Sequence, residues 1–556
     1  MQADNPIPDG MSWYAEPPQP SPERPRLTFD LDVDVGVVGG GLAGLTTARE
    51  IARRGWSVAL LEAQTVGFGA SGRNLGFVIP GFQESIDRIV ERVGMDHARE
   101  LWALSEGGVD YVRDTIRDTA MPGVEPVGGW INVSKFREDS GLNSTATLLR
   151  ENFGAQVETW SKQQVREVLR SPLYQNAIYY PRAFQVDPLN YTLGLAAAAE
   201  QAGVRIFEHT PALSIDPAGI RKRIGTPSAR LRASQIVLAG NTGLGGLMPR
   251  LAASLLPVTS FVAVTAPLGD KLKQAVTFKG GVSDSDTVDN HYRIIDGNRL
   301  MWSGGQRVSE TDPARFKRRL AGDIQRAYPQ LGRVEIAHVW SGTASIAVHS
   351  MPQIGEFARG VWVANGFAGQ GINTTAMAGQ LIARGIVEND ETWRLFAPYD
   401  LVWAGGSAGR AALQVRYWAH RTKERIDALL LAEDMPEESI VAAAPEPAVM
   451  PAEPVTVPGV EQPALEIPVA PAEPAAAEAE PVPPADPAAA EPEPVPPAEK
   501  PPAKPRKKRA PRKTTTPKKA AAPRKRTKKA AVAEDKTGTE VETEPPAAAG
   551  RVTADN

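Results

Sequence analysis

The clearest chemical signature in this chain is Gly39-Gly40-Gly41-Leu42-Ala43-Gly44, which has the spacing G-x-G-x-x-G. A glycine at the first position permits a tight turn, the second lets the backbone approach a pyrophosphate, and the third allows close packing of a helix on a strand. The helix that opens there would hold the anion through its free N–H groups and its dipole. Gly39, Gly41 and Gly44 are therefore predicted to bind a dinucleotide.

An acidic residue at the right distance strengthens this prediction. Glu62 follows the next predicted strand, about 20 residues beyond the glycines, where a carboxylate can accept hydrogen bonds from ribose hydroxyls. The glycines alone would also suit an ordinary turn in another α/β protein. The order of predicted strand, glycine turn, helix, strand and acid favours the dinucleotide site.

A second small-residue segment, Gly67–Asn74, comes directly after Glu62 and so lies beside the nucleotide. Its backbone amides suit a chain lying along an extended cofactor, and it favours FAD over NAD, although a flexible surface loop is the alternative. The cofactor contacts predicted from this segment are Gly69, Ser71, Arg73 and Asn74.

A third glycine-rich segment, Gly366–Gly371, lies between a predicted strand at 360–364 and a predicted helix over 374–386. The N-terminus of such a helix, aimed at the N1–C2 carbonyl edge of a flavin, would stabilise the negative charge that reduction places there. A simple turn between strand and helix is the alternative. The predicted cofactor contacts are Gly369, Gln370, Gly371 and Ile372.

The substrate contacts are expected on a strand near residues 292–295. Arg293 could clamp a carboxylate with two hydrogen bonds, and Tyr292 stands beside it. Core packing for Tyr292 and a surface ion pair for Arg293 are the alternatives, and His291 is read as a satisfied sheet residue. The chain has 6 histidines without metal-ligand spacing, so no metal site is predicted.

These residues require an α/β fold. The run of valines from Val33, the helix expected over 42–54 and the strand over 57–61 form one βαβ unit, and similar units recur in the middle and near the end of the chain. We therefore expect a Rossmann-like FAD-binding domain built from residues 31–82, 180–245 and 340–400. An antiparallel-sheet α+β substrate domain would comprise residues 83–179 and 246–339, the first of these with helices over 84–120 and 143–170.

The two ends of the chain differ from this middle part. Residues 1–30 are predicted to form an extended arm, residues 401–436 a helical segment and residues 437–556 a disordered tail, acidic at first and then basic. Such a basic run could bind nucleic acid without sequence preference, although a solvated tail is favoured. The formal net charge of −3 averages these two blocks.

Composition excludes some chemistry. The chain of 556 residues contains no cysteine, so disulfides, thiolate metal sites and a cysteinyl flavin link are ruled out, and non-covalent FAD is expected. No apolar run is long enough to span a membrane and no signal peptide is evident, which predicts a cytoplasmic protein.

The segment from Val35 to Gly76 resembles the N-terminal FAD signature of the D-amino-acid oxidase-like superfamily, nearest to the branch that contains γ-glutamylputrescine oxidase. The resemblance covers roughly residues 12–400. It continues through Asp289-Asn290-His291-Tyr292-Arg293, Gly304-Gly305, Trp340-Ser341-Gly342, Met351-Pro352 and Gly366–Gly371. It implies a two-lobed flavoprotein that oxidises a C–N bond of a small amine or amino acid to an imine by hydride transfer to flavin N5, with O2 or an electron carrier as acceptor.

Two other functions stay open at this point. One is an FAD dehydrogenase of D-amino or hydroxy acids that passes electrons to a carrier. The other is a nucleic-acid-associated protein whose flavin domain is vestigial.

Overall fold

The computed structural model describes residues 11–15, 23–135, 141–284, 290–308 and 312–433. Contacts divide the chain into two units, Met1–Ala452 and Glu453–Asn556, and the described residues all belong to the first. The predicted disordered tail at 437–556 and the nucleic-acid binding expected of its basic part lie outside the described residues.

The first of two sheets, sheet A, has a parallel centre. Its main path runs in the order β16 (Gln353–Ala358), β17 (Val361–Asn365), β10 (Arg230–Leu238), β1 (Leu31–Val38), β2 (Val58–Leu61), β7 (Arg205–Phe207). The strands from β17 to β7 are parallel to their neighbours, whereas β16 is antiparallel to β17. A short antiparallel extension at β10 is formed by β9 (Lys222–Gly225) and β8 (Ser214–Asp216).

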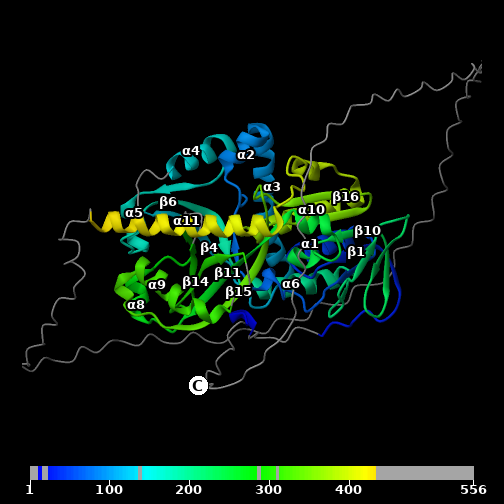
Figure 1. The fold of residues 1–556 in the computed structure, drawn as a ribbon, viewed down its shortest axis with the longest axis horizontal. Coiled ribbons are helices and arrows are strands. Elements are labelled where there is room, and N and C mark those ends of the chain that lie inside the picture. Colours follow the sequence, from blue (N-terminus) through cyan, green and yellow to red (C-terminus); the bar gives the residue numbers. More distant parts are fainter. Residues whose placement is uncertain (1–10, 16–22, 136–140, 285–289, 309–311, 434–556) are drawn as a thin grey trace, which may run out of the picture. The chain divides into compact units, whose positions relative to one another are not determined.

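Helices cover sheet A because its strands are apolar on both faces, as parallel strands usually are. All four residues of β2 are buried, and Val35 and Val37 of β1 are fully enclosed. One face packs in a single core cluster with side chains of four helices. These helices, several of which are labelled in Figure 1, are α1 (Leu42–Ala52), α3 (Met95–Thr119), α6 (Pro188–Gln201) and α10 (Gly371–Glu388).

Sheet B is antiparallel except for one parallel pair, β12 with β4. Its order is β15 (Ile336–Ala347), β11 (Leu255–Thr265), β14 (Arg299–Arg307), β13 (His291–Ile295), β12 (Gly281–Asp284), β4 (Val127–Lys135), β6 (Tyr174–Gln185), β3 (Phe77–Val78), and β5 (Glu158–Trp160) pairs with β6. The predicted fold class, a Rossmann-like domain made of separated segments with an antiparallel-sheet domain, is thus confirmed.

The remaining helices are short except for α11. They are α2 (Ile86–Val93), α4 (Leu142–Phe153), α5 (Lys162–Val168), α7 (Pro249–Ala253), α8 (Asp270–Ala275), α9 (Lys317–Ala327) and α11 (Gly406–Glu433). Single 3-10 turns lie at η1 (Trp13–Ala15), η2 (Ala70–Gly72), η3 (Asn241–Leu244), η4 (Pro313–Phe316), η5 (Pro329–Leu331) and η6 (Thr392–Phe396).

Some predicted boundaries differ from the elements found. Divisions at 179/180 and 339/340 fall inside β6 and β15, two strands of sheet B. The helix expected over 143–170 is instead α4, β5 and α5. Helix α3, expected in the substrate domain, shares the core of sheet A, because its apolar stripe packs against α10.

The described part of the N-terminal arm is packed rather than free. Residues 23–30 form no helix or strand, but Leu27 is 1 % exposed. Arg24 holds Glu200 of α6 through two hydrogen bonds of 2.8 and 3.0 Å. Burial of Tyr14 in η1 likewise fixes residues 11–15 against sheet B, where its ring lies 5.8 Å from that of Trp340. The arm therefore contributes to the folded body.

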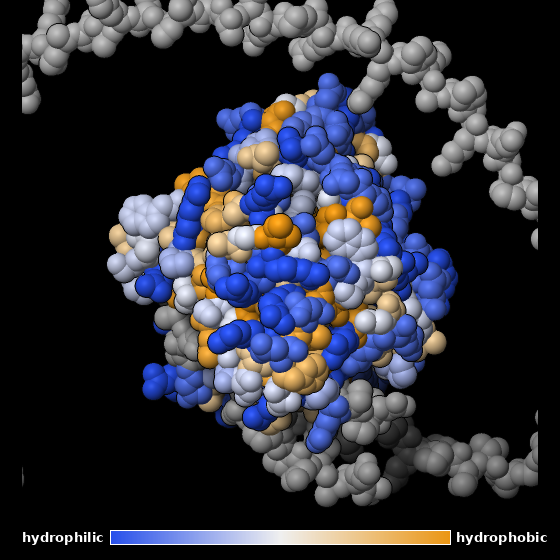
Figure 2. All heavy atoms as spheres, turned by 90° about the vertical axis from the view of Figure 1, so that its right-hand side faces the viewer, coloured by the Kyte–Doolittle hydropathy of each residue, from blue (hydrophilic) through white to orange (hydrophobic). Residues whose placement is uncertain are grey.

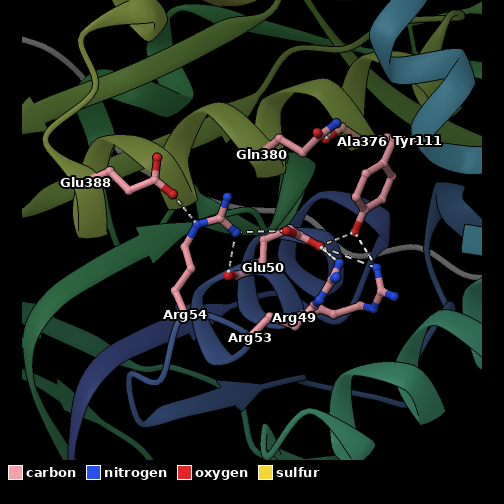
Figure 3. A network of polar contacts seen from close by, with 8 residues as sticks. All are labelled: Arg49, Glu50, Arg53, Arg54, Tyr111, Ala376, Gln380 and Glu388. Carbon is pink, nitrogen blue, oxygen red and sulfur yellow. Dashed lines mark hydrogen bonds and ion pairs between the residues drawn. The ribbon is translucent and has the colours of Figure 1, made fainter. Parts of the chain in front are cut away.

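A buried carboxylate ties three helices of sheet A together (Figure 3). Glu50 of α1 accepts hydrogen bonds from Arg54 at 2.8 Å, Arg53 at 3.1 Å and the Tyr111 hydroxyl of α3 at 2.8 Å. Arg54 also donates to Glu388 of α10 at 2.6 Å. Burial alone would raise the pKa of Glu50, but these hydrogen bonds and the nearby arginine charges lower it overall.

The face of the molecule on the right of Figure 1 is mostly polar. Figure 2 shows hydrophilic side chains over most of it, with hydrophobic atoms in separated groups. Scattered apolar side chains of this kind are normal on a protein surface.

Candidate active site

A cavity of about 1360 Å³ is lined by both sheets and by α11. It begins where the parallel strands β1, β2, β10 and β17 end, the edge at which open α/β sheets bind ligands. Its volume exceeds the roughly 300–1,000 Å³ typical of a pocket for one small molecule. There is room for a dinucleotide together with a substrate.

The first glycine motif forms a close-fitting cradle at this edge. Gly39 has φ +114°, a conformation that side chains disfavour. A Cβ on Gly44 would lie 2.0 Å from the Gly39 carbonyl oxygen, and one on Gly41 would lie 2.8 Å from Ser71 Oγ. Helix α1 starts at Leu42, and Gly41, Leu42 and Ala43 all line the cavity, so the N-terminus of α1 faces it. This geometry fits a pyrophosphate.

Glu62 lies on the cavity wall just after β2. Its two carboxylate oxygens accept hydrogen bonds from the backbone N–H groups of Gly40 at 2.7 Å and Gln64 at 2.8 Å. The carboxylate is thereby held against the glycine turn. Its remaining lone pairs suit the ribose contact predicted for it.

The second segment lies against the first. Ser71 Oγ accepts a hydrogen bond from Leu42 N–H at 3.0 Å, so the hydroxyl sits at the start of α1. Arg73 donates to the carbonyl oxygens of Phe68 at 2.9 Å and Ser341 at 3.3 Å, and burial lowers the pKa of its guanidinium. These bonds connect the segment to sheet B.

Asn74 and Gly69 have different roles in that segment. The Asn74 amide donates to two carbonyl oxygens of η2 and accepts from Gly76 N–H at 2.7 Å, so this side chain fixes the loop. A Cβ on Gly69 would meet nothing within 4 Å. Both residues line the cavity, but neither shows a side-chain group free to bind a cofactor.

A second helix N-terminus faces the same cavity. Helix α10 begins at Gly371, and Gln370 gives it no side-chain cap. Gly369, Gln370, Gly371 and Ile372 all line the wall. Gly369 N–H donates to Gln83 Oε1 at 3.2 Å, and Gln370 Oε1 is buried with no hydrogen-bond partner among the described residues. The open helix end can stabilise a second negative charge.

Sheet B supplies a polar row opposite these helices. Asn132, Ser283, His291 and Ser303 stand beside one another on consecutive strands β4, β12, β13 and β14, and all four line the cavity. Ser283 Oγ accepts from Trp130 Nε1–H at 2.9 Å and lies 2.7 Å from His291 Nδ1. Burial lowers the pKa of His291 to about 4, so the ring is neutral near pH 7.

His291 was not predicted as a site residue. Alternation along a strand places it and Arg293 on one face and Tyr292 on the other. This alternation can be predicted from the sequence, but the face of the strand that meets the cavity cannot.

The placement of Tyr292 corrects its predicted role. It does not line the cavity and is fully buried. Its hydroxyl lies 2.6 Å from that of Tyr328 and donates to that of Tyr174 at 3.2 Å, and its ring stacks on Trp302. Core packing, the alternative weighed from the sequence, describes this residue.

Arg293 needs the same correction, for a different reason. It faces the cavity side of sheet B but is covered by Tyr14 of η1, whose hydroxyl accepts from Arg293 Nη2 at 3.0 Å. Its Nη1 donates to the Val186 carbonyl at 2.9 Å. The guanidinium of Arg293 is thus hydrogen-bonded to Tyr14, which is distant in sequence. Arg293 does not line the cavity.

Within the described ranges, no helix has the length and apolar character needed to cross a membrane. Nor do three or more His, Asp and Glu side chains of the described part gather as a possible metal site.

A dinucleotide cradle, a second helix N-terminus and a facing antiparallel sheet define a flavin-dependent oxidoreductase. Comparison with known families agrees: the family described as FAD dependent oxidoreductase (DAO) matches residues 34–384. This chain belongs to that family, and FAD is its cofactor.

The similarity to individual relatives covers most of the length of each relative. The chain is 30% identical over 392 residues to the "Probable oxidoreductase OrdL" of Haemophilus influenzae, covering 69% of this chain and 90% of that protein. It is 29% identical over 391 residues to "Gamma-glutamylputrescine oxidoreductase" of Escherichia coli, covering 69% and 91%. The crystal structure of glycine oxidase from Geobacillus kaustophilus has the same fold, with TM-score 0.57, 24% identity and coverage of 67% and 98%.

Proposed function

We propose that this protein oxidises a C–N bond of a small amine or amino acid to an imine, with hydride transfer to the N5 atom of FAD. The observation that carries this is one cavity that is lined both by two helix N-termini and by the polar row Asn132–Ser283–His291–Ser303. Relatives named for γ-glutamylputrescine and glycine support the substrate class.

The cofactor would lie along the edge of sheet A. Gly39, Gly41 and Gly44 would admit its pyrophosphate to the N-terminus of α1, with Ser71 beside it. Glu62 would accept from the ribose, and Gly369–Ile372 would place the N-terminus of α10 at the pyrimidine edge of the flavin. Bound FAD supplies the hydride acceptor. The expectation of non-covalent binding remains a prediction.

The polar row would orient the substrate. Trp130 Nε1–H occupies one lone pair of Ser283 Oγ, so the Ser283 hydroxyl hydrogen can be donated to His291 Nδ1. That arrangement puts the hydrogen of the neutral imidazole on Nε2. The row then presents donors from His291, Ser303 and Asn132 without a strong acid or base, which suits a hydride transfer that depends on orientation and a dry site.

The alternatives make different predictions. A dehydrogenase of D-amino or hydroxy acids would use the same cavity but transfer electrons to a carrier, so oxygen uptake during turnover separates it from an oxidase. A cytoplasmic location also remains a prediction. The alternative of a nucleic-acid-associated protein with a vestigial flavin domain has no support, because the FAD family matches residues 34–384 and the basic tail lies outside the described residues.

Anaerobic mixing tests the proposed function. The flavin-loaded protein is mixed with amines, amino acids and hydroxy acids while absorbance near 450 nm is recorded. We expect bleaching by at least one compound with a C–N bond that carries a hydrogen on the carbon. If none bleaches a flavin that dithionite can reduce, C–N oxidation is refuted.

A further inference from the structure

Helix α11 lines the cavity but lies outside the part of the chain that matches the family. The family match ends at residue 384, whereas α11 spans Gly406–Glu433. In Figure 1 it runs as a long yellow helix across the strands of sheet B, and it contacts β11 and β14. Three of its residues, Leu413, Arg416 and Tyr417, line the cavity. Their spacing of three and four residues puts them on one face of the helix.

The start of α11 is fixed in place. The turn before it uses positive φ values at Gly405 (+80°) and Gly406 (+54°), and a Cβ on Gly409 would lie 1.7 Å from the Ala404 carbonyl oxygen. Ala404 N–H donates to the Ala253 carbonyl at 2.8 Å. This turn returns the chain toward sheet B, so the helix direction is set by backbone geometry.

Two contacts then hold the helix at the cavity. Gln414 Oε1 accepts from Val308 N–H, at the end of β14, at 3.3 Å. Tyr417 is 5 % exposed. Arg416, between these two, therefore stands at the cavity wall with an exposed side chain and a defined backbone position.

The arginines of the cavity wall differ in whether they have a partner. Of its arginines, Arg73 donates to two carbonyl oxygens and Arg88 lies 3.8 Å from Glu84. Arg416 has no hydrogen-bond or ion-pair partner among the described residues. The acids of the described wall are Glu62, which is held by backbone N–H groups, and Glu84. The sheet B side thus offers a cation and neutral donors, and no carboxylate in the described part.

We infer that Arg416 of α11 binds an anionic group of the substrate, so that the preferred substrate is an amine bearing a carboxylate rather than a diamine. This inference rests on the proposed function and deepens it. A guanidinium recognises a carboxylate through paired hydrogen bonds, and a second ammonium on the substrate would meet it with like charge. The alternative anion is the FAD pyrophosphate, but α11 contacts β11 and β14 of sheet B, whereas the glycine turn lies between β1 and α1 at the edge of sheet A.

The test uses compounds that differ only in one end group. The flavin-loaded full-length protein is mixed anaerobically with 4-aminobutanoate, 4-aminobutanamide and 1,4-diaminobutane, and with alanine and alaninamide. Bleaching at several concentrations gives an apparent Kd for each. We expect the carboxylates to bind more tightly than their amides, and the diamine most weakly. Tighter binding of the diamine than of 4-aminobutanoate overturns the inference.

Two variants of α11 test whether Arg416 is responsible for the tighter binding of carboxylates. Arg416→Met should weaken carboxylate binding by up to about fivefold, the range of an exposed ion pair, and leave amide binding and FAD affinity unchanged. Arg410→Met removes an exposed arginine of α11 outside the cavity wall and should change neither. Equal effects of both variants, or loss of FAD from Arg416→Met alone, would contradict the assignment. Absence of bleaching by any compound, with dithionite still effective, would instead refute the proposed C–N oxidation.

Discussion

The hydroxyl oxygen of Ser71 accepts a hydrogen bond from the backbone N–H of Leu42 at 3.0 Å. This contact joins two sequence motifs at the N-terminus of α1, where an anion is stabilised by the helix. The Gly41 backbone passes so close that its missing side chain leaves Ser71 room to make the bond. A pyrophosphate site is therefore built from both motifs together.

Gly41→Ala should weaken FAD binding with little loss of fold. The new Cβ would lie 2.8 Å from Ser71 Oγ, so the serine must turn and release Leu42 N–H. We expect an FAD dissociation constant higher by on the order of tenfold, which corresponds to ~1.4 kcal/mol. Flavin fluorescence titration of the apoprotein measures it. Gly107→Ala, in an open position on α3, is the control and should leave FAD affinity unchanged.

Glu50→Gln should destabilise the sheet A domain. The substitution leaves Arg49, Arg53 and Arg54 around a side chain that is only 7% exposed. Breaking a buried ion pair in this way costs about 3 kcal/mol, seen as a lower melting temperature. Glu388→Gln, at a 48% exposed partner of Arg54, should cost under ~1 kcal/mol. Similar melting temperatures for both variants would contradict the structural role of Glu50.

Tyr292→Phe separates a core role from a catalytic one. Loss of its hydroxyl leaves Tyr328 and Tyr174 without a buried partner, which should cost ~1–3 kcal/mol of stability. Because the side chain does not line the cavity, kcat/KM should stay within about twofold, a difference of ~0.4 kcal/mol. A folded variant with normal FAD content and no turnover would restore Tyr292 to the catalytic machinery.

His291 should make stability depend on pH in mildly acidic solution. Its folded-state pKa of about 4 lies below the ordinary 6.5, so the unfolded chain binds the extra proton first. Stability should be fully present above pH 6.5 and fall as pH drops toward 4. His349, whose pKa burial also lowers, acts in the same direction. The slope contributed by His291 is therefore the difference between wild type and His291→Asn in urea denaturation at each pH. Equal slopes would contradict the lowered pKa of His291.

The βαβ unit and the three glycine-rich segments could be predicted because their signals are local. A strand buried on both faces, a glycine turn and the start of a helix occupy neighbouring residues, and the cofactor edge follows from the parallel order. The same reasoning placed α10 within three residues of its observed start.

The substrate side could not be predicted in this way, because long-range packing decides it. Which face of β13 meets the cavity depends on its pairing with β12 and β14, so His291 was overlooked and Tyr292 misplaced. Arg293 donates a hydrogen bond to Tyr14, which is 279 residues away along the chain. The contribution of α11 likewise depends on the turn at Gly405 and on docking to β14.

The most direct test of the account is the flavin content of the purified full-length protein. The sample is scanned between 300 and 600 nm, precipitated with acid, and the supernatant is assayed for FAD. We predict a flavin spectrum, close to one FAD per chain after incubation with excess FAD, and complete release of that FAD into the supernatant. A folded protein that remains colourless and takes up no added FAD would contradict the central claim.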